Sequence, residues 1–285
     1  MSLTLSPVRA LRTARHGSLK GLDPLWVPLG KVYRAALRVM PFKRPTRQWV
    51  GSFGPYRMDP HFAFSDFAGW GGESNRVFTA CIEACRDKSC VFDVGAYIGL
   101  GALPMASVLA PGGRVYAFEA AEANQRYLTK HLMLNQIVNV QLVDAVIGAE
   151  DLPAARFFEE SRPSPRNSVV GKDGSTRFLM VHHRQLSLDS VARTRVLTPD
   201  VIRIDVGGGE MAVLEGAREV LEQAKPIVFL TVYPGQLEAL GASAAALHGL
   251  ITDLGYLCRD LDGNLVSQLA YGDYRLDPLA PRAVA

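Results

Sequence analysis

The segment Val91–Leu103, VFDVGAYIGLGAL, ends an apolar run in an acid and opens at once into a glycine-rich turn. Its first residues favour a buried strand, and Gly95, Gly99 and Gly101 let the backbone approach a ligand closely. The spacing is neither G-x-G-x-x-G nor a glycine followed by Lys-Ser/Thr, which are the patterns of dinucleotide-binding and phosphate-binding loops. Asp93, two residues before the first glycine, instead suits a ligand that carries an ammonium group.

A second acid, Glu119, ends the next apolar run, VYAFEA, about one strand-helix-strand unit further along the chain. A carboxylate at this place can accept hydrogen bonds from both hydroxyls of a ribose. Asp93, the glycines and Glu119 together predict a site for S-adenosylmethionine (SAM), whose aminoacyl and ribose portions need such partners. The alternative is that each acid only caps the helix that follows its strand, which is a common use of acids at such turns.

Composition limits the class of protein. The chain has 285 residues and 48% hydrophobic residues, enough for one large core with appendages, and it holds no apolar run long enough to span a bilayer. The first fifty residues contain ten Lys and Arg but one acid, so the formal net charge of +3 hides a net acidic remainder. We therefore expect a basic, partly helical N-terminal arm over residues 1–50 and a second domain over residues 51–285.

The arm allows three interpretations. Residues 31–40 mix apolar and basic side chains at roughly helical spacing. They could form a helix packed on the domain with its charges in water, a contact with an anionic membrane surface or a lipid-linked substrate, or a nucleic-acid contact, which is the least expected. The first twenty residues lack the apolar core of a signal peptide and predict a mobile tail.

The four cysteines show no metal-binding spacing, and no other metal cluster is visible in the sequence. We therefore expect no metal site and a reduced, cytoplasmic setting, with peripheral attachment to the membrane as an alternative. The sequence leaves the oligomeric state open.

From residue 91 onward, apolar strand-like runs alternate with helical stretches; the runs are VFDVG, VYAFEA, VQLVDAVIG, VIRIDVG and IVFLTVYP. An irregular stretch without a predicted element separates the third run from the fourth, and a helix is expected over residues 239–254. This alternation predicts an α/β fold, in which helices cover both faces of a mostly parallel sheet and an antiparallel strand lies at the C-terminal edge. Ligands bind beyond the carboxyl ends of such strands. The acids and other polar residues at these ends are Asp93, Glu119, Asp144, Asp205, Thr231 and Tyr233. Residues 159–173 hold two prolines and many polar side chains, which predict a long loop at the substrate end.

These motifs resemble those of the FkbM family of SAM-dependent methyltransferases. VFDVGAYIG is similar to the family's D-V-G-A-N-x-G turn, with Tyr97 where Asn is usual, and VYAFEA is similar to its second motif. VIRIDVGGGEMAVLEGA is close to its I-D-V-E-G-A-E-x-x-V-L-x-G-A stretch, and the pair Leu188-Asp189 lies upstream. The resemblance covers roughly residues 70 to 265. It implies a Rossmann-like class I methyltransferase fold with an added antiparallel strand, and a methyl acceptor that is a hydroxyl of a sugar, a polyketide or another small molecule.

Two departures from the family pattern concern the acceptor side. Gly207 stands where the family usually carries Glu, and Thr231-Val232-Tyr233 stands where the next strand often ends in Glu. Both changes remove carboxylates, whereas the acids of the cofactor side are intact. An alternative function is therefore a catalytically impaired SAM-binding protein with a docking or regulatory role. A third interpretation is a nicotinamide-dependent dehydrogenase, but the sequence lacks the glycine spacing that such an enzyme requires.

Methyl transfer from a sulfonium is an in-line displacement, so positioning supplies much of the acceleration and a base need only accept the hydroxyl proton. Asp205 is the first candidate for that base or for holding the acceptor, although it could instead bond to the amides of the glycine run. We expect Tyr233 to orient the acceptor. His182 or His183 is a further candidate base if their segment folds back over the site. Adjacent residues of a strand point to opposite faces, so at most one of the two can enter the pocket.

The remaining assignments follow from the same motifs. The residues that we expect to contact SAM are Asp93, Gly95, Tyr97, Gly99, Glu119, Ala120, Asn124, Asp144, Ala145 and Asp205. Glu210 is interpreted as an acid in the first turn of a helix, where the helix dipole favours it. Arg162 and Arg166 in the long loop fit either an anionic acceptor or a solvated loop.

Overall fold

The computed structural model describes residues 28, 30–35, 37, 44–70, 76–171 and 177–279. The chain divides into two compact units, Met1–Gly69 and Trp70–Ala285. The boundary expected after residue 50 falls inside the first unit, between the two strands of a hairpin.

The first unit contains a helical segment and a small hairpin. Residues 30–35 and 37 are helical, where the sequence predicts a helix over 31–40, and most of the expected arm lies outside the described residues. Strand β1 (Thr46–Val50) pairs antiparallel with β2 (Phe53–Met58), and a short 3-10 helix, η1 (Pro60–Phe62), follows. Val50 and Met58 are completely buried, and the Asp59 carboxylate caps η1 by accepting the His61 amide at 2.7 Å.

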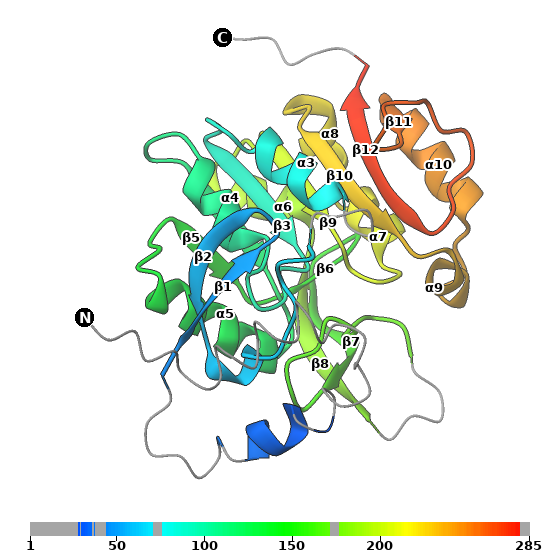
Figure 1. Ribbon diagram of the computed structural model, residues 1–285. Coiled ribbons are helices and arrows are strands. Elements are labelled where there is room, and N and C mark those ends of the chain that lie inside the picture. Colours follow the sequence, from blue (N-terminus) through cyan, green and yellow to red (C-terminus); the bar gives the residue numbers. More distant parts are fainter. Residues whose placement is uncertain are drawn as a thin grey trace. The chain divides into compact units, whose positions relative to one another are not determined.

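The second unit is built on a seven-stranded sheet with the order β11-β12-β10-β9-β3-β4-β5 (Figure 1). Its strands are β3 (Cys90–Val94), β4 (Arg114–Phe118), β5 (Val140–Val143), β9 (Val201–Ile204), β10 (Ile227–Val232), β11 (Tyr256–Arg259) and β12 (Gly272–Pro278). The five strands β10, β9, β3, β4 and β5 are parallel to one another, whereas β12 is antiparallel to both β10 and β11. The α/β class, the Rossmann-like order and the antiparallel C-terminal strand are confirmed, and β11 takes the outermost position.

Helices cover both faces of this sheet (Figure 1). The helices that share one core with Phe92 and Val94 of β3 include α6 (Leu188–Arg195), α7 (Glu210–Glu215), α8 (Arg218–Gln223) and α10 (Ala244–Asp253). On the other side lie α3 (Arg76–Ala84), α4 (Ala102–Val108) and α5 (Glu122–Leu134). Asp93 alternates with Phe92 and Val94 along the strand and therefore points to the face of α4, where Gly101 approaches its Oδ2.

Two segments differ from the expected elements. The run VQLVDAVIG is not one strand, because β5 ends at Val143 and β6 (Val146–Ile147) joins a second sheet with the order β6-β8-β7. The stretch without a predicted element forms the long hairpin of β7 (Leu152–Glu160) and β8 (Phe178–Leu186), which pair antiparallel. The expected helix over 239–254 is interrupted, since α9 (Pro234–Ala239) ends before α10, whose first turn is capped by Ser243.

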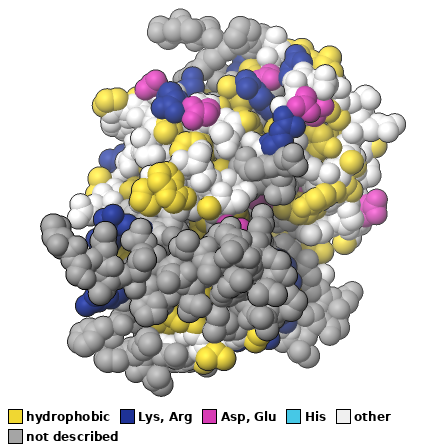
Figure 2. All heavy atoms as spheres, viewed as in Figure 1, with side chains coloured by type: hydrophobic (Ala, Val, Ile, Leu, Met, Phe, Trp, Pro, Cys, Tyr) yellow, Lys and Arg dark blue, Asp and Glu magenta, His cyan; other side chains and the backbone are white. Residues whose placement is uncertain are grey.

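Charges of both signs lie next to one another in the upper part of the face shown in Figure 2. Arg86 pairs with Glu83 and Arg76 with Asp262, and all four side chains are about half exposed or more. Exposed ion pairs of this kind add little to the free energy of unfolding. Because both signs of charge are present, they create no electrostatic potential of a single sign over this surface. Among the described helices, none combines the length and the apolar character that crossing a membrane requires.

Candidate active site

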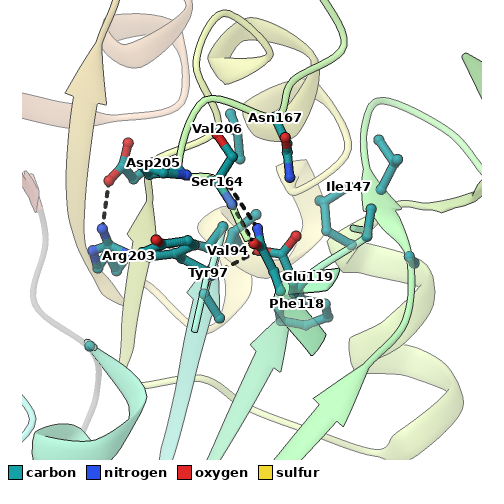
Figure 3. Close-up of a pocket in the computed structure, with 18 of the residues that line it drawn as sticks. Val94, Tyr97, Phe118, Glu119, Ile147, Ser164, Asn167, Arg203, Asp205 and Val206 are labelled. Atoms are coloured by element: carbon teal, nitrogen blue, oxygen red, sulfur yellow. Dashed lines mark hydrogen bonds and ion pairs between the residues drawn. The ribbon is translucent and has the colours of Figure 1, made fainter. Parts of the chain in front are cut away.

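A cavity opens at the carboxyl ends of β3, β4 and β9, as expected for a parallel sheet. The empty space between its lining atoms is about 770 Å³, which includes open space at its mouth. Figure 3 shows the lining residues from the three strands, with Ser164 and Asn167 of the loop after β7 across the cavity from Glu119.

Three charged side chains lie next to one another at one side of the cavity. Asp93 and Arg203 lie opposite each other in the parallel register of β3 and β9, and Asp205 follows two residues later on the same face. Arg203 donates from Nη1 to Asp93 Oδ1 at 2.8 Å and from Nη2 to Asp205 Oδ2 at 2.6 Å. The guanidinium therefore joins Asp93, the acid of the first motif, to Asp205, and Figure 3 shows the second of these contacts.

Asp93 lies behind the cavity wall, whereas Arg203 and Asp205 line it. The Asp93 side chain is completely buried, and its Oδ2 has no hydrogen-bond partner among the described residues. Burial raises the pKa of Asp93, and the charge of Arg203 opposes that rise. Asp93 contacts Arg203 directly and does not line the cavity. Its contribution to ligand binding would therefore be to hold the Arg203 guanidinium in place.

Asp205 lines the cavity and accepts hydrogen bonds from two side chains. Besides Arg203, it accepts a hydrogen bond at Oδ1 from the Tyr233 hydroxyl at 3.0 Å. Burial and the charge of Asp205 raise the pKa of Tyr233, so this hydroxyl stays a donor. The ring of Tyr233 lies 5.5 Å from that of the exposed Tyr271. The structure thus brings together Asp205 and Tyr233, the two residues expected on the acceptor side.

Glu119 is fixed by the backbone on both sides. Its Oε2 accepts the Tyr97 amide at 2.8 Å and its Oε1 accepts the Ala121 amide at 2.9 Å. Burial raises the pKa of Glu119 to about 7, although these amides favour the ionised form. Tyr97 reaches Glu119 with a positive φ of 53°, and Gly95 must be glycine because a Cβ there would lie 2.0 Å from the Asp205 carbonyl oxygen.

The other residues expected at the cofactor divide into two groups. Tyr97, Ala120, Asn124 and Ala145 line the cavity together with Gly95 and Glu119, whereas Gly99 and Asp144 do not. Asn124 exchanges two hydrogen bonds with the backbone of Ser164, at 3.0 and 2.9 Å, and so ties α5 to the loop after β7. Asp144 is exposed and accepts a hydrogen bond from Gln125 at 2.6 Å.

The histidine pair lies outside the cavity. His182 is exposed on β8 opposite Arg156, and His183 on the other face of the strand lies 3.3 Å from Glu159. Side chains alternate along a strand, so the two imidazoles point to opposite faces of β8, and neither lines the cavity. The structure therefore does not bring His182 to the acceptor side. Glu210 also lies outside, where it accepts the Gly208 amide at 2.7 Å at the start of α7.

Sequence reasoning missed Arg203, Ser164 and Asn167. The strand VIRIDV carries a signal for Arg203, because alternation places residues 203 and 205 on one face and Ile202 and Ile204 on the other. Ser164 and Asn167 lie in a loop without a repeating pattern, so nothing local marks them. Within the described ranges, no group of three or more His, Cys, Asp or Glu side chains could hold a metal ion, and the four cysteines are buried and free.

Several known proteins are similar to this chain. A structure of methyltransferase FkbM from Methylobacillus flagellatus KT is 18% identical with a TM-score of 0.42, and the match covers 67% of this chain and 44% of that one. Fibrillarin from Aeropyrum pernix, in complex with natively bound S-adenosyl-L-methionine, is 14% identical with a TM-score of 0.36, covering 68% of each chain. A SAM-dependent methyltransferase from Aquifex aeolicus is 13% identical with a TM-score of 0.37, covering 70% and 87%.

The chain thus spans less than half the length of the Methylobacillus protein. A comparison with curated protein sequences gave no match. Residues 93–258 match the family model described as the methyltransferase FkbM domain. This match includes the β3 turn, Glu119 and the Arg203–Asp205 wall, and it covers 166 of the 285 residues. The chain belongs to the FkbM family of methyltransferases.

Proposed function

We propose that this protein transfers the methyl group of SAM to a hydroxyl oxygen of a small molecule such as a sugar, a glycolipid or a natural product. The observation that carries the proposal is Glu119. Each of its oxygens accepts one backbone amide and keeps a lone pair for a ligand in the cavity that it lines. The two neighbouring hydroxyls of a ribose can donate to these two oxygens.

The described residues fit SAM at two further places. Val146 and Ile147 give one end of the cavity an apolar lining that suits a purine. At the other end, the guanidinium of Arg203 lies between two carboxylates, and this arrangement leaves one net negative charge beside a positively charged ligand. When bound, SAM would supply an electrophilic methyl group on its sulfonium.

Asp205 and Tyr233 are the side chains that we expect to hold the acceptor. The Asp205 carboxylate is oriented by Arg203 and by the Tyr233 hydroxyl, and it is about one-third exposed. Its remaining lone pairs can accept the acceptor's hydroxyl proton, so one carboxylate both orients the nucleophilic oxygen and receives the proton at Oδ1 or Oδ2. Fixing this geometry is the main contribution of the protein to the rate.

A second candidate function is a SAM-binding protein with impaired catalysis and a docking or regulatory role, because Gly207 and Thr231 replace acids of the family pattern. One contact argues against it. Asp273 on β12 lies opposite Thr231 and accepts a hydrogen bond from its hydroxyl at 2.7 Å. A neighbouring strand thus provides a carboxylate beside the position where the family carries Glu. We therefore favour the enzyme over the impaired protein.

The role of the basic arm stays a prediction. Contact with an anionic membrane surface or a lipid-linked substrate rests on residues that lie largely outside the described part of the chain. The cytoplasmic location rests on the cysteine spacing in the sequence and also stays a prediction.

The proposal is tested by incubating the purified protein with SAM that carries a deuterated methyl group and with an extract of the native host. We expect S-adenosylhomocysteine (SAH) to form together with a product that has gained a deuterated methyl group, and we expect Asp205→Asn to suppress both. Tight binding of SAM without methyl transfer to any acceptor would favour the second candidate. An absence of SAM binding would contradict both functions.

A further inference from the structure

The loop that follows β7 contributes three residues to the cavity, Ser164, Pro165 and Asn167. The side-chain nitrogen Nδ2 of Asn167 is buried and has no hydrogen-bond partner among the described residues. A buried amide donor that stays unpaired costs about 1–3 kcal/mol. A donor of this kind at the wall of a ligand cavity therefore marks a place where the ligand itself accepts a hydrogen bond.

The orientation of this amide is determined by its other end. Asn167 Oδ1 accepts a hydrogen bond from the Glu160 backbone nitrogen at 3.0 Å. Exchanging the amide oxygen and nitrogen would place the NH2 group against that N–H, so two donors would face each other. The contact thus directs Nδ2 away from β7 and toward the cavity, as Figure 3 shows for the labelled Asn167.

The loop is anchored by Glu160, whose side chain is about 1% exposed. Its Oε1 accepts hydrogen bonds from the Ser164 hydroxyl at 2.7 Å and from Arg166 at 3.2 Å, and its Oε2 accepts from Arg162 at 3.2 Å and from Arg177. Burial works to raise the pKa of Glu160, but the bonds from Ser164 and the arginines outweigh it and lower the pKa. The carboxylate stays ionised and holds both ends of the loop.

A second anchor fixes the loop to the cofactor motif. The two hydrogen bonds between Asn124 and Ser164 connect it to α5, directly after the segment that contains Glu119. Since both anchors are formed within the protein, the Asn167 donor is placed before a ligand binds. A preorganised donor loses little entropy on binding and contributes to specificity.

The surroundings of Asn167 identify the kind of acceptor. Ile147, Phe157 and Val169 also line the cavity, and their side chains are apolar. Apolar side chains in the same cavity as the Asn167 donor suit a flat aromatic ring that carries an unprotonated nitrogen. We propose that Asn167 donates a hydrogen bond from Nδ2 to a ring nitrogen of the adenine of SAM, and that it is a specificity-determining residue of the cofactor site. This inference rests on the proposed function.

The test measures binding by titration calorimetry and needs no acceptor. The ligands are SAH and its 1-deaza, 3-deaza and 7-deaza analogues, in each of which one ring nitrogen is replaced by C–H. Asn167→Asp keeps an oxygen for the Glu160 amide but replaces the NH2 donor by an acceptor. Asn264→Asp, at an exposed turn outside the cavity, makes the same chemical change as a control.

We expect Asn167→Asp to bind SAH about tenfold more weakly than the wild type, which is the factor for one lost hydrogen bond of this kind. One deaza analogue should bind the wild type and Asn167→Asp equally, because it lacks the nitrogen that accepts the bond. Asn264→Asp should bind SAH like the wild type. If Asn167→Asp shows an early thermal transition, Asn167→Ser repeats the comparison with a neutral side chain.

Two results would overturn the inference. One is an unchanged affinity of the variant for SAH, and the other is an equal loss for SAH and all three analogues. Either result leaves the proposed function intact as long as the wild type binds SAH. A wild type that binds no SAH would instead contradict the proposed function.

Discussion

Glu119 gives the cofactor site a pH dependence whose size follows from the structure. Burial raises the pKa of this carboxyl to about 7, against an ordinary value near 4.5. The ionised form accepts hydrogen bonds at both oxygens, whereas a protonated carboxyl must donate from one of them. Since two backbone amides and two ribose hydroxyls would all donate to Glu119, we expect the ionised form to be the one that binds.

The magnitude follows from the fraction of ionised carboxyl. With a pKa of about 7, that fraction rises from about 9% at pH 6 to about 91% at pH 8, and the apparent affinity rises by the same factor of about ten. The pH must be varied at constant ionic strength, because charged ligands respond to salt. SAH is the better ligand for this measurement because it carries no sulfonium charge.

Titration calorimetry at pH 6, 7 and 8 gives the dissociation constants. We expect the wild type to bind SAH about tenfold more tightly at pH 8 than at pH 6. Glu119→Gln cannot ionise at this position, so its weaker binding should stay flat over the same range. A constant affinity of the wild type, or one that falls as the pH rises, would refute the reasoning. A slope that persists in Glu119→Gln would assign the effect to another group.

Three further predictions follow from the same side chains. Between pH 4.5 and 7 the folded protein keeps a proton on Glu119 that the unfolded chain loses. The free energy of unfolding of the apo protein should therefore fall by about 3 kcal/mol over this range relative to that of Glu119→Gln. Urea denaturation at several pH values measures this difference. Arg203→Met should lower the free energy of unfolding at pH 7 by about 3–5 kcal/mol, since it leaves the buried Asp93 without its partner, and the double variant Arg203→Met/Asp93→Leu should recover part of the loss in the same assay. Asp205→Asn should reduce the rate of methyl transfer at least a hundredfold, while its affinity for SAH changes only a few-fold. Asp273→Asn should cause a smaller loss of turnover. Equal rates for the wild type and Asp205→Asn would exclude that carboxylate as the proton acceptor.

Much of the fold could be predicted because the parallel strands are buried on both faces. β3 and its neighbours appear as continuous apolar runs that end in acids, so the parallel sheet and the position of its ligand edge could be inferred. The hairpin of β7 and β8 could not, because many of its side chains are exposed or half-buried and their polarity hides the strand pattern. Which face of such a hairpin is buried is determined by tertiary packing, so it cannot be inferred from the local sequence.

The site shows the same division. Glu119 and Asp205 could be located because they follow predicted strands directly, and Tyr233 follows β10 in the same way. The position of Asp93 behind the cavity wall could not be predicted, since it depends on the register between β3 and β9 that places Arg203 opposite it. The position of Asn167 depends on its loop, in which Ser164 bonds to Asn124, 40 residues earlier in the sequence. Contacts of this range have no local signal.

The most direct test of the account is a crystal structure of the protein with SAH. We expect the ribose hydroxyls within hydrogen-bond distance of the two oxygens of Glu119, the adenine between Ile147 and the loop that carries Asn167, and the sulfur directed toward Asp205. SAH bound elsewhere, or in this cavity with its ribose away from Glu119, would contradict the account.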